Sequence, residues 1–249
     1  MKKNMYYKTL YQRKNLIKEF LLNLFIELSS HPRMVLEVFI RKKMGRRYFR
    51  TSTAITVAVA LFIIPFFWSN LRQDFIQIIS DNWLWYLFIP VFLFFSFLRY
   101  KDIKHIKSQF DFNHFSLSTG EIHPLFHKIK INGKPFSVRT IEIFLEPLLF
   151  FLIGLFLIFI DQNSLGWLLV ICSAIYSLSY SGTYMHGDNF ILDRIDNIIS
   201  GEEIYRTFVS DDEPSRGFRF YGDKPTSKEM REEVLENIIV DDEEITDAV

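Results

Sequence analysis

The amino-acid sequence predicts an all-α membrane protein with four transmembrane helices arranged as two hairpins. Four long apolar segments are separated by polar stretches. Two of the connections are short and hold one basic residue between them, whereas the loop at 100–140 holds seven. The ends of the chain carry opposite charge. Residues 1–51 contain 13 Lys and Arg against 3 Asp and Glu, a net of +10, whereas residues 184–249 contain 7 against 18, a net of −11.

The basic segment at residues 1–51 is expected to form amphipathic helices on the cytoplasmic side. Apolar residues recur at helical spacing over 16–28 and again over 34–40, and residues 29–32 separate the two patterns. Arg33, Glu37 and Arg41 form the polar face of the second pattern. Crossing a bilayer takes about 20 residues. Both helices are shorter, so we expect them to lie in the membrane interface or to pack against the ends of the spans.

A cluster of basic residues lies just before the first apolar segment. In this position a basic cluster anchors the topology of the following span, and anionic lipid headgroups attract it. The sequence therefore predicts a lipid-binding or topology-determining role for Arg41, Lys42, Lys43, Arg46, Arg47 and Arg50.

The four expected spans cover residues 53–68, 83–97, 141–160 and 165–180, the last extending as far as 184. The first hairpin occupies 52–99 and the second 141–184. Trp68, Trp83, Trp85 and Trp167 lie near span ends, as an aromatic belt requires. Because basic loops stay in the cytoplasm, we expect both termini and the 100–140 loop on the cytoplasmic side of a multi-pass membrane protein.

The 100–140 loop contains one local pattern that predicts a strand pair. Residues 128–138 alternate between apolar and polar on both sides of Asn132-Gly133. This dipeptide favours a two-residue β-hairpin turn, so a small cytoplasmic hairpin is expected, with Pro135 restricting its strand to an edge.

The acidic tail at 185–249 is expected to be partly flexible and to contain two helices. Asp188 would cap a helix at 189–200 that ends at Gly201, residues 210–225 would be a linker, and Thr226 with Glu229 matches a capping box for a helix at 227–239. Apolar residues form a stripe on this last helix. We expect the stripe either to bind a partner or to dock on the chain itself through Met230, Val234 and Ile238.

Glu146 is the strongest candidate for intramembrane chemistry. It precedes Pro147, so it would cap a helix start or, as an alternative, form an ion or proton site within the membrane. Glu142 is expected at the interface. His123 and His127 have the i,i+4 spacing of a zinc pair, but Pro124 lies between them and no other ligand pattern accompanies them.

The sequence predicts no enzyme, cofactor, metal or nucleic-acid site. No phosphate-binding, nucleophile-elbow or dinucleotide motif is present. The single cysteine, Cys172, excludes a disulfide within the chain.

Four stretches of sequence, HPRMVLEVFIRKKMGRRYF, TGEIHPLF, EPLLFFLIG and NFILDRID, together resemble small inner-membrane proteins encoded beside bacterial conjugation or contact-dependent (type VI-like) secretion machinery. The resemblance implies a bacterial inner membrane and a scaffold role, and it implies no catalytic residue.

The expected function is a non-enzymatic scaffold or anchor subunit of a larger trans-envelope assembly. Its partners would be membrane lipids and other protein subunits, and the chain would act as an oligomer. The alternative is an oligomeric ion channel or small transporter that uses Glu146.

Overall fold

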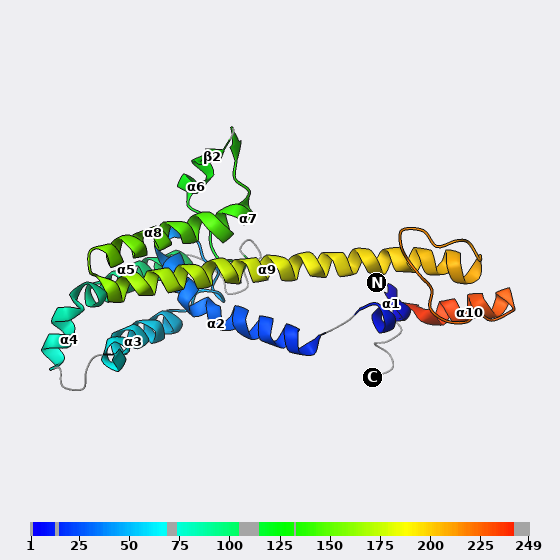
Figure 1. The fold of residues 1–249 in the computed structure, drawn as a ribbon, viewed down its shortest axis with the longest axis horizontal. Helices are drawn as coiled ribbons and strands as arrows, with labels where there is room; N and C mark the ends of the chain where they lie inside the picture. Colours follow the sequence, from blue (N-terminus) through cyan, green and yellow to red (C-terminus); the bar gives the residue numbers. More distant parts are fainter. Residues whose placement is uncertain (1, 13–14, 69–73, 105–114, 132, 242–249) are drawn as a thin grey trace. The chain divides into compact units, whose positions relative to one another are not determined.

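The computed structural model describes residues 2–12, 15–68, 74–104, 115–131 and 133–241 (Figure 1). The described chain is mainly helical, with two two-stranded antiparallel sheets. It forms two compact units. Residues 22–183 form one, which we call the bundle unit, and residues 1–21 with 184–249 form the other, which we call the terminal unit.

The bundle unit contains most of α2 and the helices that follow it, up to the first half of α9. Its helices are α2 (Leu16–Ile40), α3 (Thr51–Trp68), α4 (Phe75–Asp81), α5 (Trp83–Lys104), α6 (Pro124–Lys128), α7 (Val138–Thr140), the π-helix η1 (Ile141–Leu145), α8 (Glu146–Phe159) and α9 (Asn163–Ile204). Within this unit, α8 and the first half of α9 lie side by side (Figure 1).

Among the described residues, three helices are long and apolar enough to cross a membrane: Trp83–Lys104, Val138–Phe159 and Asn163–Val209. They include three of the four predicted spans. The remaining predicted span corresponds to Thr51–Phe67, which is apolar but shorter than these three helices. The predicted aromatic belt is wrong for Trp85, because its side chain is 2% exposed and its indole N–H donates to the Leu61 carbonyl at 2.7 Å.

The N-terminal amphipathic segment differs from the prediction of two separate interfacial helices. Residues 16–40 form one continuous helix, α2, with Pro32 inside it. Pro32 lacks the N–H that would donate to the carbonyl of Leu28 in the preceding turn, but the helix continues through it. Residues 33–38 of α2 are all buried, so this stretch is part of the core of the bundle unit.

Aromatic and small residues hold these helices together. The ring of Phe39 on α2 lies 5.0–6.5 Å from four other rings, those of Phe88, Phe92, Phe95 and Phe150. α8 and α9 approach closely at Gly154, where an added Cβ would lie 2.8 Å from the Gly166 carbonyl oxygen. A side chain at either glycine would therefore force α8 and α9 apart.

Part of the predicted middle loop is fixed to the chain before α3. The Gly45 N–H donates to the Ser118 carbonyl and the Arg47 N–H to the Ser116 carbonyl, both at 2.8 Å. The predicted β-hairpin is present: β2 (Lys130–Ile131) pairs with β3 (Lys134–Pro135), and Gly133 has a φ of 77° in the turn. Pro135 lies opposite Lys130 at the end of this pair.

The terminal unit joins the two ends of the chain. β1 (Lys2–Asn4) pairs antiparallel with β4 (Ile239–Asp241), and Lys2 lies opposite Asp241. α1 (Met5–Leu10), the π-helix η2 (Tyr205–Val209) and α10 (Lys228–Ile238) surround a small core. Its buried members are Ile204, Phe208, Val209, Phe218 and Leu235.

Two predictions about the tail are corrected. Asp188 does not begin a helix and Gly201 does not end one, because α9 continues without a break from Asn163 to Ile204. The predicted last helix is present as α10, but its cap is Ser227 rather than Thr226, since the Ser227 hydroxyl accepts from the Met230 N–H at 3.3 Å.

Candidate functional site

The candidate site is a buried network of charged and hydroxyl side chains in the bundle unit, with Arg41 at its centre. Arg41 is the residue directly after α2, and its side chain is fully buried. A guanidinium has five N–H groups to donate. The Arg41 Nε donates to Glu146 Oε2 at 3.1 Å, and one terminal nitrogen contacts both Glu146 and Glu142, the latter at 3.1 Å. The other terminal nitrogen donates to Thr119 at 2.8 Å and to Tyr180 at 2.5 Å. These contacts engage all three nitrogens of the group.

A second arginine, about two helical turns before the first, repeats this arrangement. Arg33 forms an ion pair with Glu37 at 3.1 Å and donates to the Ser179 hydroxyl at 3.1 Å. Arg33 also donates to the Tyr48 hydroxyl at 2.8 Å, and that hydroxyl in turn donates to Glu37. Burial alone would lower the pKa of Arg33, but the neighbouring Glu37 carboxylate raises it above its usual value. Arg33 therefore remains a cation.

Two tyrosines of α9 connect the two arginines. The Tyr180 hydroxyl donates to Glu37 at 2.8 Å while it accepts from Arg41, and the Tyr176 hydroxyl donates to Glu146 at 2.5 Å. The guanidinium carbon of Arg41 lies 4.9 Å from the Tyr180 ring centroid, and that of Arg33 lies 4.6 Å from it. The network is therefore continuous from Arg33 to Glu146.

The charges of the network do not balance. It contains two arginines and three carboxylates, those of Glu37, Glu142 and Glu146. Buried ions are stable only when they are paired and hydrogen-bonded. Glu146 accepts from three donor nitrogen and oxygen atoms at Oε2, whereas its buried Oε1 has no hydrogen-bond partner among the described residues. The excess negative charge and this unpartnered oxygen identify Glu146 as the least satisfied member.

The helix around Glu146 contains a π-helical turn. The backbone N–H of Glu146 donates to the Ile141 carbonyl, five residues earlier, which closes the π-helical turn η1. Pro147 follows and has no N–H to continue the ordinary helical ladder. Isolated π-turns within α-helices are frequent at functional sites. The turn places Glu142 and Glu146 on the side of the helix that faces Arg41.

Glu146 and Tyr176 lie at one depth along the α8–α9 pair. Glu146 is 14 residues before Ile160, and Tyr176 is 13 residues after Asn163, where α9 begins. At about 1.5 Å per residue both lie about 20 Å from the turn that joins the helices. Across a hydrocarbon core of about 30 Å, this distance would be about two-thirds of the thickness.

The structure brings together two residues that the sequence assigned to separate sites. Arg41 was predicted to face lipid headgroups, and this is wrong because its side chain is buried against Glu146. The other five members of the basic cluster are exposed, as a headgroup-binding role requires: Lys42, Lys43, Arg46, Arg47 and Arg50. Glu146 was predicted to cap a helix start, but it lies within the continuous helix Val138–Phe159. Glu142 was expected at the interface and is buried instead.

One signal in the sequence could have identified the network. Arg33, Glu37 and Arg41 recur every four residues, and so do Glu142 with Glu146 and Tyr176 with Tyr180. Residues four apart lie on one face of a helix. Polar residues at this spacing in otherwise apolar helices indicate faces that turn toward one another.

The structure leaves part of the partner-binding stripe predicted on α10 exposed and packs the rest against the chain itself. Met230 and Val234 are 57% and 40% exposed. Ile238 packs against the core of the terminal unit, next to Leu235, which is 7% exposed. Among the described residues, no group of three or more His, Cys, Asp and Glu is placed to hold a metal ion. His123 caps α6 by accepting from the Leu125 N–H.

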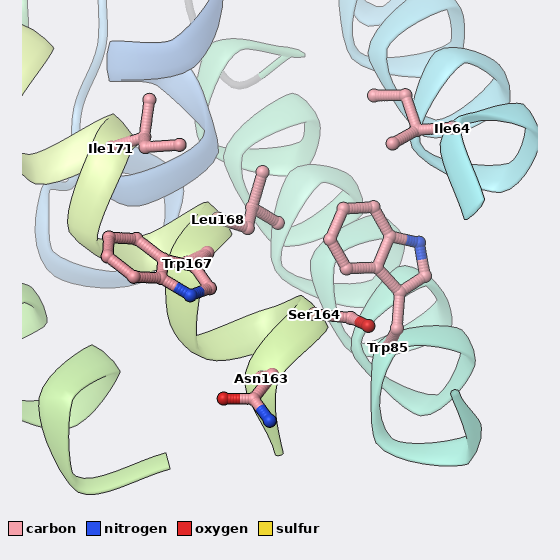
Figure 2. Close-up of a pocket in the computed structure, with 7 residues that line it drawn as sticks. All are labelled: Ile64, Trp85, Asn163, Ser164, Trp167, Leu168 and Ile171. Carbon is pink, nitrogen blue, oxygen red and sulfur yellow. The ribbon is translucent and has the colours of Figure 1, made fainter. Parts of the chain in front are cut away.

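An apolar pocket of about 460 Å³ lies elsewhere in the bundle unit, between α3, α5 and the start of α9. Figure 2 shows the side chains that line it: Ile64, Trp85, Asn163, Ser164, Trp167, Leu168 and Ile171. None of them is ionisable and none belongs to the buried network, so the pocket has apolar walls and no acid–base chemistry.

No protein-family model matches the chain, and no curated protein or solved structure is similar to it. The helices and the buried network define a helical protein with three segments suited to crossing a membrane.

Proposed function

We propose that this protein is a non-enzymatic scaffold or anchor subunit of a larger assembly in the bacterial inner membrane, of the trans-envelope secretion or conjugation type. In this proposal, residues 22–183 hold the protein in the bilayer through four spans in two hairpins. The termini and the middle loop are cytoplasmic, where the exposed basic residues between Lys42 and Arg50 contact anionic lipids. The terminal unit binds the other subunits.

The engagement of Arg41 is the observation that supports an anchor. All three nitrogens of its guanidinium contact side chains of this chain, and those side chains come from η1, α8, α9 and the segment at 115–121. A group so fully engaged has no donor left for a ligand. Its effect is to hold the end of α2 in the bundle, as a structural part of an anchor would.

The exposed apolar residues of α10 support a docking role for the terminal unit. Leu235 fixes the helix to its own chain, while Met230 and Val234 remain exposed on it. An amphipathic helix with free apolar anchors fits a hydrophobic groove of a partner.

The test is co-purification from native membranes, with bound proteins identified and quantified. Met230→Glu with Val234→Glu should reduce recovery of the partner subunits, because the charges prevent burial in a groove. Lys228→Glu on the same helix is the control and should leave recovery unchanged. Equal recovery with all three proteins would contradict docking through α10, and the absence of any specifically bound subunit would contradict the scaffold role.

A second candidate, an oligomeric channel or small transporter, is favoured by one observation: within the part of the chain that the structure describes, the buried Oε1 of Glu146 has no hydrogen-bond partner. An intramembrane carboxylate with a free oxygen is suited to binding a proton or cation. Ion and proton flux into liposomes containing the purified protein tests this candidate. Flux that Glu146→Gln abolishes would support it, and absence of flux in the wild-type protein would exclude these ions as its cargo.

A further inference from the structure

The second half of α9 presents two different faces. One face is covered by the N-terminal residues of the terminal unit. Asn4 donates to the Ser200 hydroxyl at 2.9 Å, and Tyr7 donates to the Asp193 carboxylate at 3.4 Å. The other face carries the α9 stripe, which we define as Ile191, Ile195 and Ile198, with exposed fractions of 59%, 46% and 58%.

Helical geometry places the α9 stripe opposite the covered face. Successive residues of an α-helix are rotated by about 100°, so the centre of the stripe lies about 170° around α9 from Asp193 and Ser200. The N-terminal residues therefore cannot cover the stripe from where they are bound. Leu192, which is 54% exposed, widens the apolar surface on one side.

The spacing of the stripe is that of a helix-pairing seam. Its members are separated by four and then three residues, the repeat of apolar positions in a two-helix coiled coil. All three are isoleucines, whose exposed apolar area favours burial. The stripe spans about two helical turns, so it suits a short contact rather than a long coiled coil.

We propose that the α9 stripe pairs with the α9 stripe of a second copy of this chain. α9 runs without a break from the apolar segment at its start to the stripe. Copies inserted in one membrane share one orientation, so their α9 helices are parallel and their stripes lie at the same distance from the bilayer. Identical stripes then meet in register, which is the self-complementary contact that a two-fold pair requires.

The charges next to the stripe argue against a lipid surface as its occupant. Asp188, Asp193 and Asp196 accompany it on the same helix stretch, with Arg194 as the single cation between them. Anionic headgroups repel such a segment. In a parallel pair, Asp193 and Asp196 point away from the seam and keep their contact with water, whereas Asp188 lies at the end of the seam, three residues before Ile191.

Site-directed cross-linking tests the pairing. The single native cysteine, Cys172, is buried, so Cys172→Ala provides a background in which one new cysteine reports one position. Ile195→Cys in native membranes should give a disulfide-linked dimer on mild oxidation. Asp196→Cys is the matched control: it is exposed on the same helix, one residue further on, and points about 100° away from the stripe.

The expected result is several-fold more dimer with Ile195→Cys than with Asp196→Cys, and loss of that dimer when Ile191→Glu and Ile198→Glu are added. Equal cross-linking at both positions, no cross-linking at Ile195, or cross-linking only to a protein of different mass would overturn the proposal. The inference rests on membrane insertion but not on the scaffold role, because the dimer is read without any other subunit. Loss of partner recovery and loss of the dimer are therefore separate outcomes.

Discussion

The bundle unit and the terminal unit use the same ion-pair chemistry in opposite environments. In the bundle unit, Arg41 and Glu146 pair with both side chains fully buried. In the terminal unit, Arg216 and Glu202 pair at 2.7 Å with both side chains 55% exposed. Water solvates the exposed pair before and after it forms, so that pair contributes little. The buried pair contributes little net stability when intact, but loss of one partner leaves an uncompensated charge. Loss of a partner in the buried pair therefore affects the bundle unit strongly, whereas loss of the exposed pair of Arg216 and Glu202 has little effect on the terminal unit.

The largest effect expected from this difference is that of Arg41→Gln. The substitution leaves Glu142 and Glu146 without their cation in a buried site, so it should lower the free energy of unfolding by about 3–5 kcal/mol. Thermal and denaturant unfolding of the purified protein in detergent measures the change. Arg216→Gln is the matched control and should alter the free energy by less than about 1 kcal/mol. Similar losses for the two variants would remove the distinction between buried and exposed pairs.

The terminal unit should respond to loss of apolar burial instead. Leu235→Ala removes a core side chain that is 7% exposed, and we expect a local loss of about 2–3 kcal/mol. Hydrogen exchange of the peptides that contain β1 and β4 should rise as the core opens. Val234→Ala, on the adjacent exposed position, should leave their exchange near the wild-type rate. If both substitutions act alike, Leu235 does not hold α10 in place.

Glu146→Gln should be milder than Arg41→Gln, although both alter one ion pair. The amide keeps an oxygen that accepts from Arg41 and Tyr176, and removing one of three carboxylates brings the charge of the network closer to balance. We expect a loss of about 1–2 kcal/mol in the same unfolding measurement. A loss as large as that of Arg41→Gln would mean that Glu146 alone provides the counter-charge of Arg41.

The smallest expected effect is a loss of stability around α10 at acidic pH. Hydrogen bonds from Lys224 and then Arg231 lower the pKa of Asp211 below its usual value. Because the folded pKa is lower than the unfolded one, this stabilisation is present above the ordinary pKa of Asp and is lost as the pH falls through the lowered value. Exchange of the α10 peptides should therefore increase modestly below about pH 4. Asp211→Asn should abolish that pH dependence, and its persistence would assign it to other carboxylates.

The sequence predicted the secondary-structure elements that depend on local patterns. The apolar segments led to the helices, the Asn132-Gly133 turn led to the β-hairpin, and the capping pattern led to α10 within a few residues. The network escaped prediction because it depends on contacts across long sequence separations, such as that of Arg41 with Glu146. The four-residue spacing of its members marks polar helix faces, but it does not show which of these faces meet.

The terminal unit escaped prediction for a similar reason. The charge difference between the ends of the chain suggested separate partners, but the pairing of β1 with β4 brings the basic and acidic ends together. Such pairing follows from the fold rather than from either segment alone. The continuity of α9 past Asp188 and Gly201 shows that a favourable helix context overrides local start and stop signals.

The role of the buried network is tested most directly by hydrogen exchange. Exchange is measured by mass spectrometry over the full length of the Arg41→Gln variant and compared with that of the wild-type protein in the same detergent. The account predicts faster exchange in the second half of α2 and in the helix around Glu146, with the peptides of α10 and β1 unchanged. Faster exchange of the same size in both units, or no change around Glu146, would contradict the claim that the buried network stabilises the bundle unit alone.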